Sequence, residues 1–128
     1  MSGESRLFYF WEMKKIYYLS TCDTCREIIR KLGGLEGYEK QDIKTQAITA
    51  IQLKEMKEMA GSYEALFSRR AIKYKELNLK DQILAENDYK RLILQEYTFL
   101  KRPVIISGDK IFIGNEKKTV AAAEAALH

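Results

Sequence analysis

The two cysteines are the residues of this chain best suited to do chemistry. Cys22 and Cys25 are the only cysteines among 128 residues, and they lie three positions apart. An apolar, aromatic run at 14–19 ends just before them, and a helical pattern at 22–32 begins with them. A thiolate at a helix N-terminus is stabilised by free N–H groups and the helix dipole, which lowers its pKa from about 8.5. We therefore expect Cys22 to be the attacking thiol and Cys25, one turn along, the resolving thiol.

Three other interpretations of the pair stay open. A structural zinc site needs four ligands, and the chain offers two cysteines and His128, its last residue, so no metal site is predicted. Two unreactive, buried cysteines are the second interpretation. A structural disulfide is the third, although such bonds are rare in cytoplasmic proteins. The position of the pair between a strand and a helix favours redox chemistry over all three.

Composition excludes several classes of protein. Lys and Arg number 22 and Asp and Glu 18, which gives a net charge of +4, and hydrophobic residues make up 46% of the chain. These values are ordinary for a globular protein, and they exclude a disordered, collagen-like or disulfide-dense chain. No apolar run approaches the ~18 residues of a membrane span. The mild charge and the lack of an RNA-recognition motif argue against direct nucleic-acid binding.

Residues 1–12 do not read as a secretory signal, because their apolar run is short and Glu12 ends it. One interpretation is a dispensable, disordered extension that precedes a start at Met13. The other is a short edge segment whose aromatic residues pack on the domain. With either interpretation we expect a cytoplasmic protein with a single domain at 13–128.

The order of expected elements indicates an α/β fold. Strand 14–19, helix 22–32 and strand 38–43 form a minimal parallel βαβ unit, with Gly33 and Gly34 ending the helix. The middle of the chain is helical, and its end changes to a hairpin and a closing helix. The expected later elements are a helix capped at Thr49 and ended by Gly61, two short helices within 62–79, a helix at 87–97, a hairpin at 104–113 and a helix at 116–127.

Pro103 is the only proline, and it directly precedes the expected hairpin. Thioredoxin-like folds carry a cis-proline before the third strand, facing the catalytic cysteine, and an X–Pro bond adopts the cis form at a cost of only about 0.5–1 kcal/mol. We expect Pro103 to take this role, which brings Arg102 near Cys22 to hold an oxyanion or stabilise the thiolate. The alternative is an ordinary proline at the start of a strand.

Three stretches together resemble the arsenate reductase (ArsC)/Spx family. They are residues 16–30 around Cys-Asp-Thr-Cys-Arg, residues 66–77 with Leu-Phe-Ser-Arg-Arg and Tyr-Lys-Glu-Leu, and residues 99–106 with Lys-Arg-Pro-Val-Ile-Ile. The resemblance covers about 14–127, with the last stretch the most specific. It implies a thioredoxin-like, glutaredoxin-like fold with an inserted helical subdomain.

The resemblance also implies site residues and a reaction. The family nucleophile matches Cys22, and the arginine before the proline matches Arg102. In the reaction that the resemblance implies, the thiolate attacks arsenate and forms an arsenylated cysteine, which an outside thiol then reduces. Ser68 stands at the family's second arginine position, followed by Arg69 and Arg70, and Gly114 stands at the third. The residues expected to bind substrate or anion are Arg26, Arg69, Arg70 and Pro103.

The basic run around Arg69 and Arg70 has a second interpretation as a solvated helix face. No bound cofactor is expected, and electrons would come from glutathione or from a glutaredoxin or thioredoxin partner.

The Spx branch offers an alternative function. Its members carry a Cys-x-x-Cys switch like Cys22/Cys25, an arginine that matches Arg70 and an Arg-Pro pair like Arg102-Pro103, and they bind the RNA polymerase α-subunit. The leading hypothesis is a thiol oxidoreductase acting on an oxyanion or a disulfide. The alternatives are an Spx-like redox-sensing transcriptional regulator and, third, a degenerate binding module.

Overall fold

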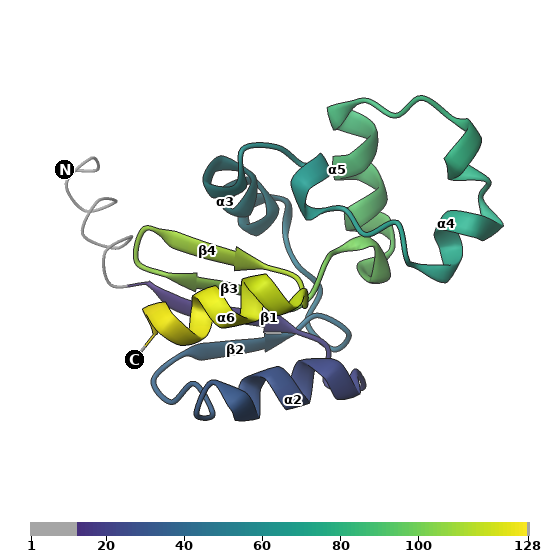
Figure 1. Ribbon diagram of the computed structural model, residues 1–128. Coiled ribbons are helices and arrows are strands. Elements are labelled where there is room, and N and C mark those ends of the chain that lie inside the picture. The colour runs from purple at the N-terminus through teal and green to yellow at the C-terminus, as the bar shows by residue number, and fades with distance from the viewer. Residues whose placement is uncertain (1–12, 128) are drawn as a thin grey trace, which may run out of the picture. The chain divides into compact units, whose positions relative to one another are not determined.

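The computed structural model describes residues 13–127, so the expectations for residues 1–12 and His128 lie outside the described residues. The expected order of strands and helices is confirmed (Figure 1). Short 3₁₀ helices, named η, add to the helical middle. In chain order the elements are β1 (Lys14–Tyr18), α2 (Asp23–Lys31), β2 (Glu39–Asp42), α3 (Ala50–Ala60), η1 (Glu64–Leu66), α4 (Ile72–Glu76), η2 (Leu79–Asp81), α5 (Glu86–Gln95), η3 (Tyr97–Phe99), β3 (Val104–Ser107), β4 (Lys110–Ile113) and α6 (Lys117–Ala126).

The described chain divides into two compact units. The first, here called the sheet unit, consists of residues 13–45 and 102–127. The second, the helical unit, is the continuous segment 46–101, inserted between β2 and β3. No helix of the described residues has the length and apolar character needed to cross a membrane.

The sheet unit is built on four strands in the order β2-β1-β3-β4. β1 runs parallel to β2 and antiparallel to β3, and β3 and β4 form the hairpin. Tyr17 of β1 pairs with Gln41 of β2 on one side and with Val104 of β3 on the other. Because β1 and β2 are parallel, their carboxyl ends meet at one edge of the sheet, where the chain enters α2.

Helices α2 and α6 pack on the same face of this sheet (Figure 1). Side chains at every third or fourth position of α2 face the strands, as a 3.6-residue period requires. Gly33 (φ 80°) and Gly34 (φ 84°) then end the helix in the left-handed region, where a side chain would be strained. The buried cluster between helices and sheet consists of Ile16, Ile28, Leu32, Leu35, Ile105, Val120 and Ala123.

The helical unit has its own core of aromatic rings. Phe67 is fully buried; it stacks on Phe99 and meets the edge of Tyr89, both at 4.9 Å between ring centroids. The predicted cap at Thr49 is present, with reciprocal hydrogen bonds between Thr49 and Gln52. The aromatic core and the helix cap are thus both formed by residues within the helical unit.

Candidate active site

Cys22 occupies the junction between the first strand and its helix. Its backbone is extended (φ −96°, ψ 113°), and it is the N-cap of α2. The Cys22 N–H donates to the Leu19 carbonyl at 3.0 Å, while its own carbonyl accepts the first helical bond, from Arg26 N–H at 3.2 Å. The residue is therefore held by its backbone at both ends, which leaves a half-buried thiol at the positive end of the helix.

The pKa of Cys22 lies below its ordinary value. Partial burial is the largest single effect and raises this pKa, but the backbone N–H and the thiol of Cys25 both lower it. The positive charge of Arg102 and the backbone N–H of Thr24 also lower it, and these four effects together exceed that of burial. Thr24 and Cys25 lie in the first turn of α2, where the positive end of the helix dipole also favours a thiolate.

Cys25 has the opposite environment. Its side chain is fully buried in the first turn of α2, and burial raises the pKa of Cys25 to about 11. The backbone of Leu19 opposes this rise, whereas the negative charge of Cys22 and the hydrogen bond to it add to the rise in pKa. The Cys25 thiol therefore stays protonated and donates toward the Cys22 sulfur.

Arg102 and Pro103 complete the same end of the sheet unit. The peptide bond between them is cis, and the Pro103 carbonyl accepts a hydrogen bond from Gly114 N–H at 2.9 Å. Val104 follows directly and pairs with Tyr17, so the Arg-Pro segment lies beside the residues that lead from β1 to Cys22. The structure thus brings together Cys22, Cys25 and Arg102, the three residues that we expect to be catalytic.

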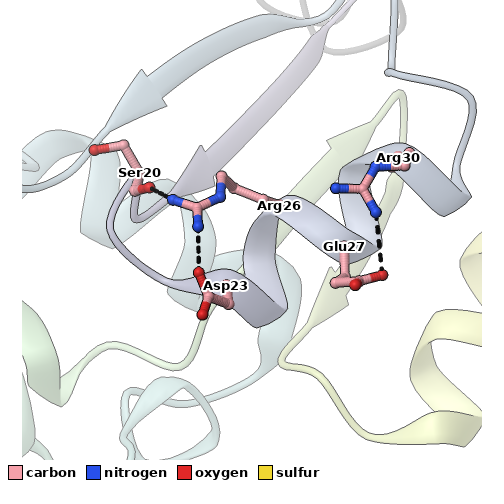
Figure 2. A network of polar contacts seen from close by, with 5 residues as sticks. All are labelled: Ser20, Asp23, Arg26, Glu27 and Arg30. Carbon is pink, nitrogen blue, oxygen red and sulfur yellow. Dashed lines mark hydrogen bonds and ion pairs between the residues drawn. The ribbon is translucent and has the colours of Figure 1, made fainter.

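Arg26 lies one turn beyond Cys22, and its guanidinium is engaged by neighbours (Figure 2). It donates to the Ser20 carbonyl at 2.7 Å and forms an ion pair with the Asp23 carboxylate. Its expected role in binding a substrate anion stays a prediction. The observed contacts instead connect the two ends of the loop that carries Cys22.

Arg69 and Arg70 belong to the helical unit. Arg69 donates to the Glu64 carboxylate and to the Tyr89 hydroxyl, each at 3.0 Å, and its guanidinium lies 5.8 Å from the Tyr89 ring centroid. The hydrogen bond to Glu64 raises the pKa of Arg69, against the effect of desolvation. Both arginines are exposed and line an open pocket of about 550 Å³. Their expected contribution to a site at Cys22 stays a prediction.

Ser20 and Asp42 are polar residues of this region that the sequence interpretation did not select. Asp42 ends β2, and its carboxylate accepts from the backbone N–H and the hydroxyl of Ser20. The position of Asp42 in the sequence could have predicted this contact, because a carboxylate at the carboxyl end of one parallel strand lies beside the loop that leaves the neighbouring strand. Among residues 13–127 no group of three or more His, Cys, Asp or Glu side chains is arranged to hold a metal ion.

Comparison with known proteins identifies the family of this chain. The sequence model of the ArsC family matches residues 17–123, which include both cysteines and the Arg-Pro pair. This chain belongs to the ArsC family. The predicted family and the predicted thioredoxin-like fold are therefore confirmed.

Similar proteins come from several bacteria. YusI, an uncharacterized protein of Bacillus subtilis (strain 168), is 29% identical over 105 residues, which are 77% of this chain and 86% of YusI. The solution structure of SACOL0876 from Staphylococcus aureus COL is 29% identical, with a TM-score of 0.70 over 91% of this chain and all of that one. A possible arsenate reductase from Streptococcus mutans UA159 is 25% identical, with a TM-score of 0.66 over 83% of this ArsC-family chain and 92% of that one.

Proposed function

We propose that this ArsC-family protein is a thiol-based oxidoreductase in which Cys22 attacks the substrate and Cys25 resolves the covalent intermediate. The observation that supports this most is the difference between the two thiols: the pKa of half-buried Cys22 is lowered, while that of buried Cys25 is raised to about 11. A nucleophile and a protonated partner thiol are thus held side by side.

With a disulfide substrate the steps balance as follows. The Cys22 thiolate attacks one substrate sulfur, a mixed disulfide forms, and the other substrate sulfur leaves as a thiolate that takes up a proton. Cys25 then loses its proton and attacks Cys22, which releases the second substrate thiol and leaves a Cys22–Cys25 disulfide. Once Cys22 is covalently bonded, its negative charge no longer raises the pKa of Cys25, so the first step prepares the second.

The cycle needs two electrons from outside. We propose that two molecules of glutathione, or one dithiol of a glutaredoxin or thioredoxin, reduce the Cys22–Cys25 disulfide and become a disulfide themselves. The reduction potential of such a pair against its donor sets the direction of the reaction. No bound cofactor takes part in these steps.

The choice between disulfide and oxyanion depends on the cations around Cys22. Arg102 acts on Cys22 through its charge, but Ser68 and Gly114 stand at the two other positions where the family resemblance implies arginine. The Ser68 side chain is uncharged, and its hydroxyl accepts a hydrogen bond from the Arg70 N–H at 3.3 Å. A site with fewer fixed cations binds a doubly charged arsenate less well than a neutral disulfide. We therefore propose a disulfide as the preferred substrate and arsenate as the weaker one.

The test is a coupled assay with glutathione, glutathione reductase and NADPH, run with a mixed disulfide of glutathione and, separately, with arsenate. We expect turnover of the disulfide, no turnover with Cys22→Ser, and a trapped glutathione adduct on Cys22 in Cys25→Ser. Full activity of Cys22→Ser would contradict the proposal. Arsenate turnover faster than disulfide turnover would reverse the proposed order of substrates.

A second candidate is the Spx-like sensor, in which the same oxidation of Cys22 and Cys25 controls binding to the RNA polymerase α-subunit. The exposed Arg70, which matches the branch's arginine, favours it. Purified α-subunit separates the two functions. Binding that depends on oxidation and is lost in Arg70→Glu, with no disulfide turnover, would favour the sensor over the oxidoreductase.

A further inference from the structure

Ser20 is held from two sides at the edge of the sheet. From β2, the Asp42 carboxylate accepts from the Ser20 hydroxyl at 2.5 Å and from the Ser20 backbone N–H at 3.3 Å. From α2, the Arg26 guanidinium donates to the Ser20 carbonyl at 2.7 Å. The backbone N–H, the carbonyl and the side chain of this one residue are thus all used in fixing it.

These contacts fix the loop that carries the reactive thiol. Ser20 precedes Cys22 by two residues, and Asp23 follows it directly. Since Arg26 binds the Ser20 carbonyl with one end of its guanidinium and the Asp23 carboxylate with the other, its side chain spans the loop around Cys22 (Figure 2). A planar guanidinium can make two such contacts at once.

The Asp42 carboxylate also binds backbone N–H groups on both sides of the contact. The Asp42 carboxylate also accepts from the Lys44 N–H at 3.2 Å, so one carboxylate joins the end of β2 to the end of β1. The hydrogen bond to the Ser20 hydroxyl lowers the pKa of Asp42, so the carboxylate is ionised at neutral pH.

We propose that Asp42 and Arg26 are positioning residues that hold Ser20, and through it hold the Cys22 sulfur against the N-terminus of α2. The effect of helix N–H groups on a thiolate falls off within the first turn, so a displaced loop loses it. This inference rests on the proposed role of Cys22 as the reactive thiol. It assigns Arg26 a contact with its own chain, in place of one with the substrate.

Charge alone predicts different results from positioning, which makes the proposal testable. Removal of the negative charge of Asp42 would, by electrostatics alone, favour the Cys22 thiolate and lower its pKa. The positioning role predicts instead that loss of Asp42 raises the pKa of Cys22. Arg26→Lys keeps the positive charge, so charge alone predicts no change, whereas positioning predicts a rise because an ammonium lacks the planar fork.

The experiment measures the rate of iodoacetamide alkylation against pH in a Cys25→Ser background, which leaves Cys22 as the single thiol. We expect Asp42→Ala and Arg26→Lys each to raise the pKa of Cys22 and to slow alkylation at neutral pH about threefold to tenfold, since one pKa unit changes the thiolate fraction about tenfold. Circular dichroism establishes that each variant is folded. Ser20→Ala, which removes only the hydroxyl contact, serves in place of Asp42→Ala if that variant does not fold.

The matched control is Arg30→Lys. Arg30 lies on the same helix and pairs with Glu27 at 3.4 Å, also three residues away, and this pair is on the far side of Arg26 from the cysteine loop (Figure 2). Its substitution should leave the alkylation profile unchanged. An equal change in Arg30→Lys would overturn the proposal, because it would show a general effect of the helix.

The remaining outcomes are equally decisive. An unchanged or lowered Cys22 pKa in both folded variants overturns the inference, and a rise in only one overturns the role of the other residue. If the parent itself alkylates with an ordinary cysteine pKa, the proposed function fails first. A low parent pKa that neither variant changes leaves the proposed function standing and removes only the positioning role.

Discussion

The pKa values of the Cys22 and Cys25 thiols are shifted in opposite directions, although the two residues are one helical turn apart. Cys25 is fully buried, and burial raises its pKa to about 11; Cys22 is half-buried at the N-cap, and its pKa is lowered. Each sulfur contributes to the shift of the other, because the protonated thiol of Cys25 donates toward the Cys22 thiolate. Such a pair titrates as a unit, and its members take different roles in thiol exchange.

The donor role of Cys25 predicts a difference between two substitutions. Cys25→Ala removes the S–H donor and should raise the pKa of Cys22, whereas Cys25→Ser keeps a hydroxyl donor and should change the pKa less. Both variants should accumulate a mixed disulfide, because neither can resolve it. Thiolate absorbance against pH measures the first effect and mass spectrometry the second. Identical titration curves for the two variants would show that Cys25 does not donate to Cys22.

The charge of Arg102 predicts a loss of reactivity when it is removed. Arg102→Gln should raise the pKa of Cys22 and slow disulfide exchange at neutral pH about threefold to tenfold, because a nearby cation favours the thiolate. Lys110→Gln is the control, since Lys110 begins β4 at the opposite end of the hairpin from Pro103. Stopped-flow kinetics checks both variants, and equal rates in wild type and Arg102→Gln would exclude this role.

Asp42 predicts a pH dependence of stability. Its pKa in the folded state is lowered by the Ser20 hydroxyl, so its contribution is fully present above the unfolded value of about 3.9 and is lost as the pH falls through the folded value. The difference in melting temperature between wild type and Asp42→Ala should therefore shrink below about pH 3.9. The Ala85 N–H lowers the pKa of Asp88, so wild type and Asp42→Ala both also lose the stabilisation from Asp88 in acid. A difference that stays constant into acid would contradict this account.

The aromatic core of the helical unit predicts that substitution of Phe67 strongly lowers the stability of the protein. Phe67→Ala removes a fully buried ring stacked on Phe99 and should lower the free energy of unfolding by about 3–5 kcal/mol. Ile83→Ala, at a fully exposed side chain, is the control and should change it by less than about 0.5 kcal/mol. Urea unfolding compares the two, and similar losses would mean that Phe67 does not anchor this core.

Local signals in the sequence were sufficient to predict most of the elements. Apolar runs predicted β1 and the β3–β4 hairpin, and helical periodicity predicted α2. The Thr49 cap and Gly61 predicted both ends of α3. Gly61 ends that helix at φ 100°, a conformation that glycine adopts without strain. These features depend on neighbours within a few residues, which is why a single sequence contains them.

Long-range polar contacts were harder to predict. Lys15 was expected only as part of a buried strand, but it is itself buried and reaches Glu39 of the parallel strand at 3.0 Å. The contact between Ser20 and Asp42 joins residues 22 positions apart and depends on the register of β1 with β2. Register is set by the packed sheet as a whole, so the sequence pattern predicted the strands without these partners.

The most direct test of the whole account is the pH dependence of Cys22 alkylation by iodoacetamide in the otherwise native protein, with peptide mapping to assign the modified thiol. The account predicts modification of Cys22 well before Cys25, with an apparent pKa below the ordinary cysteine value of about 8.5 and a rate at neutral pH above that of free cysteine. A Cys22 that titrates at or above that value and reacts no faster than free cysteine would contradict it.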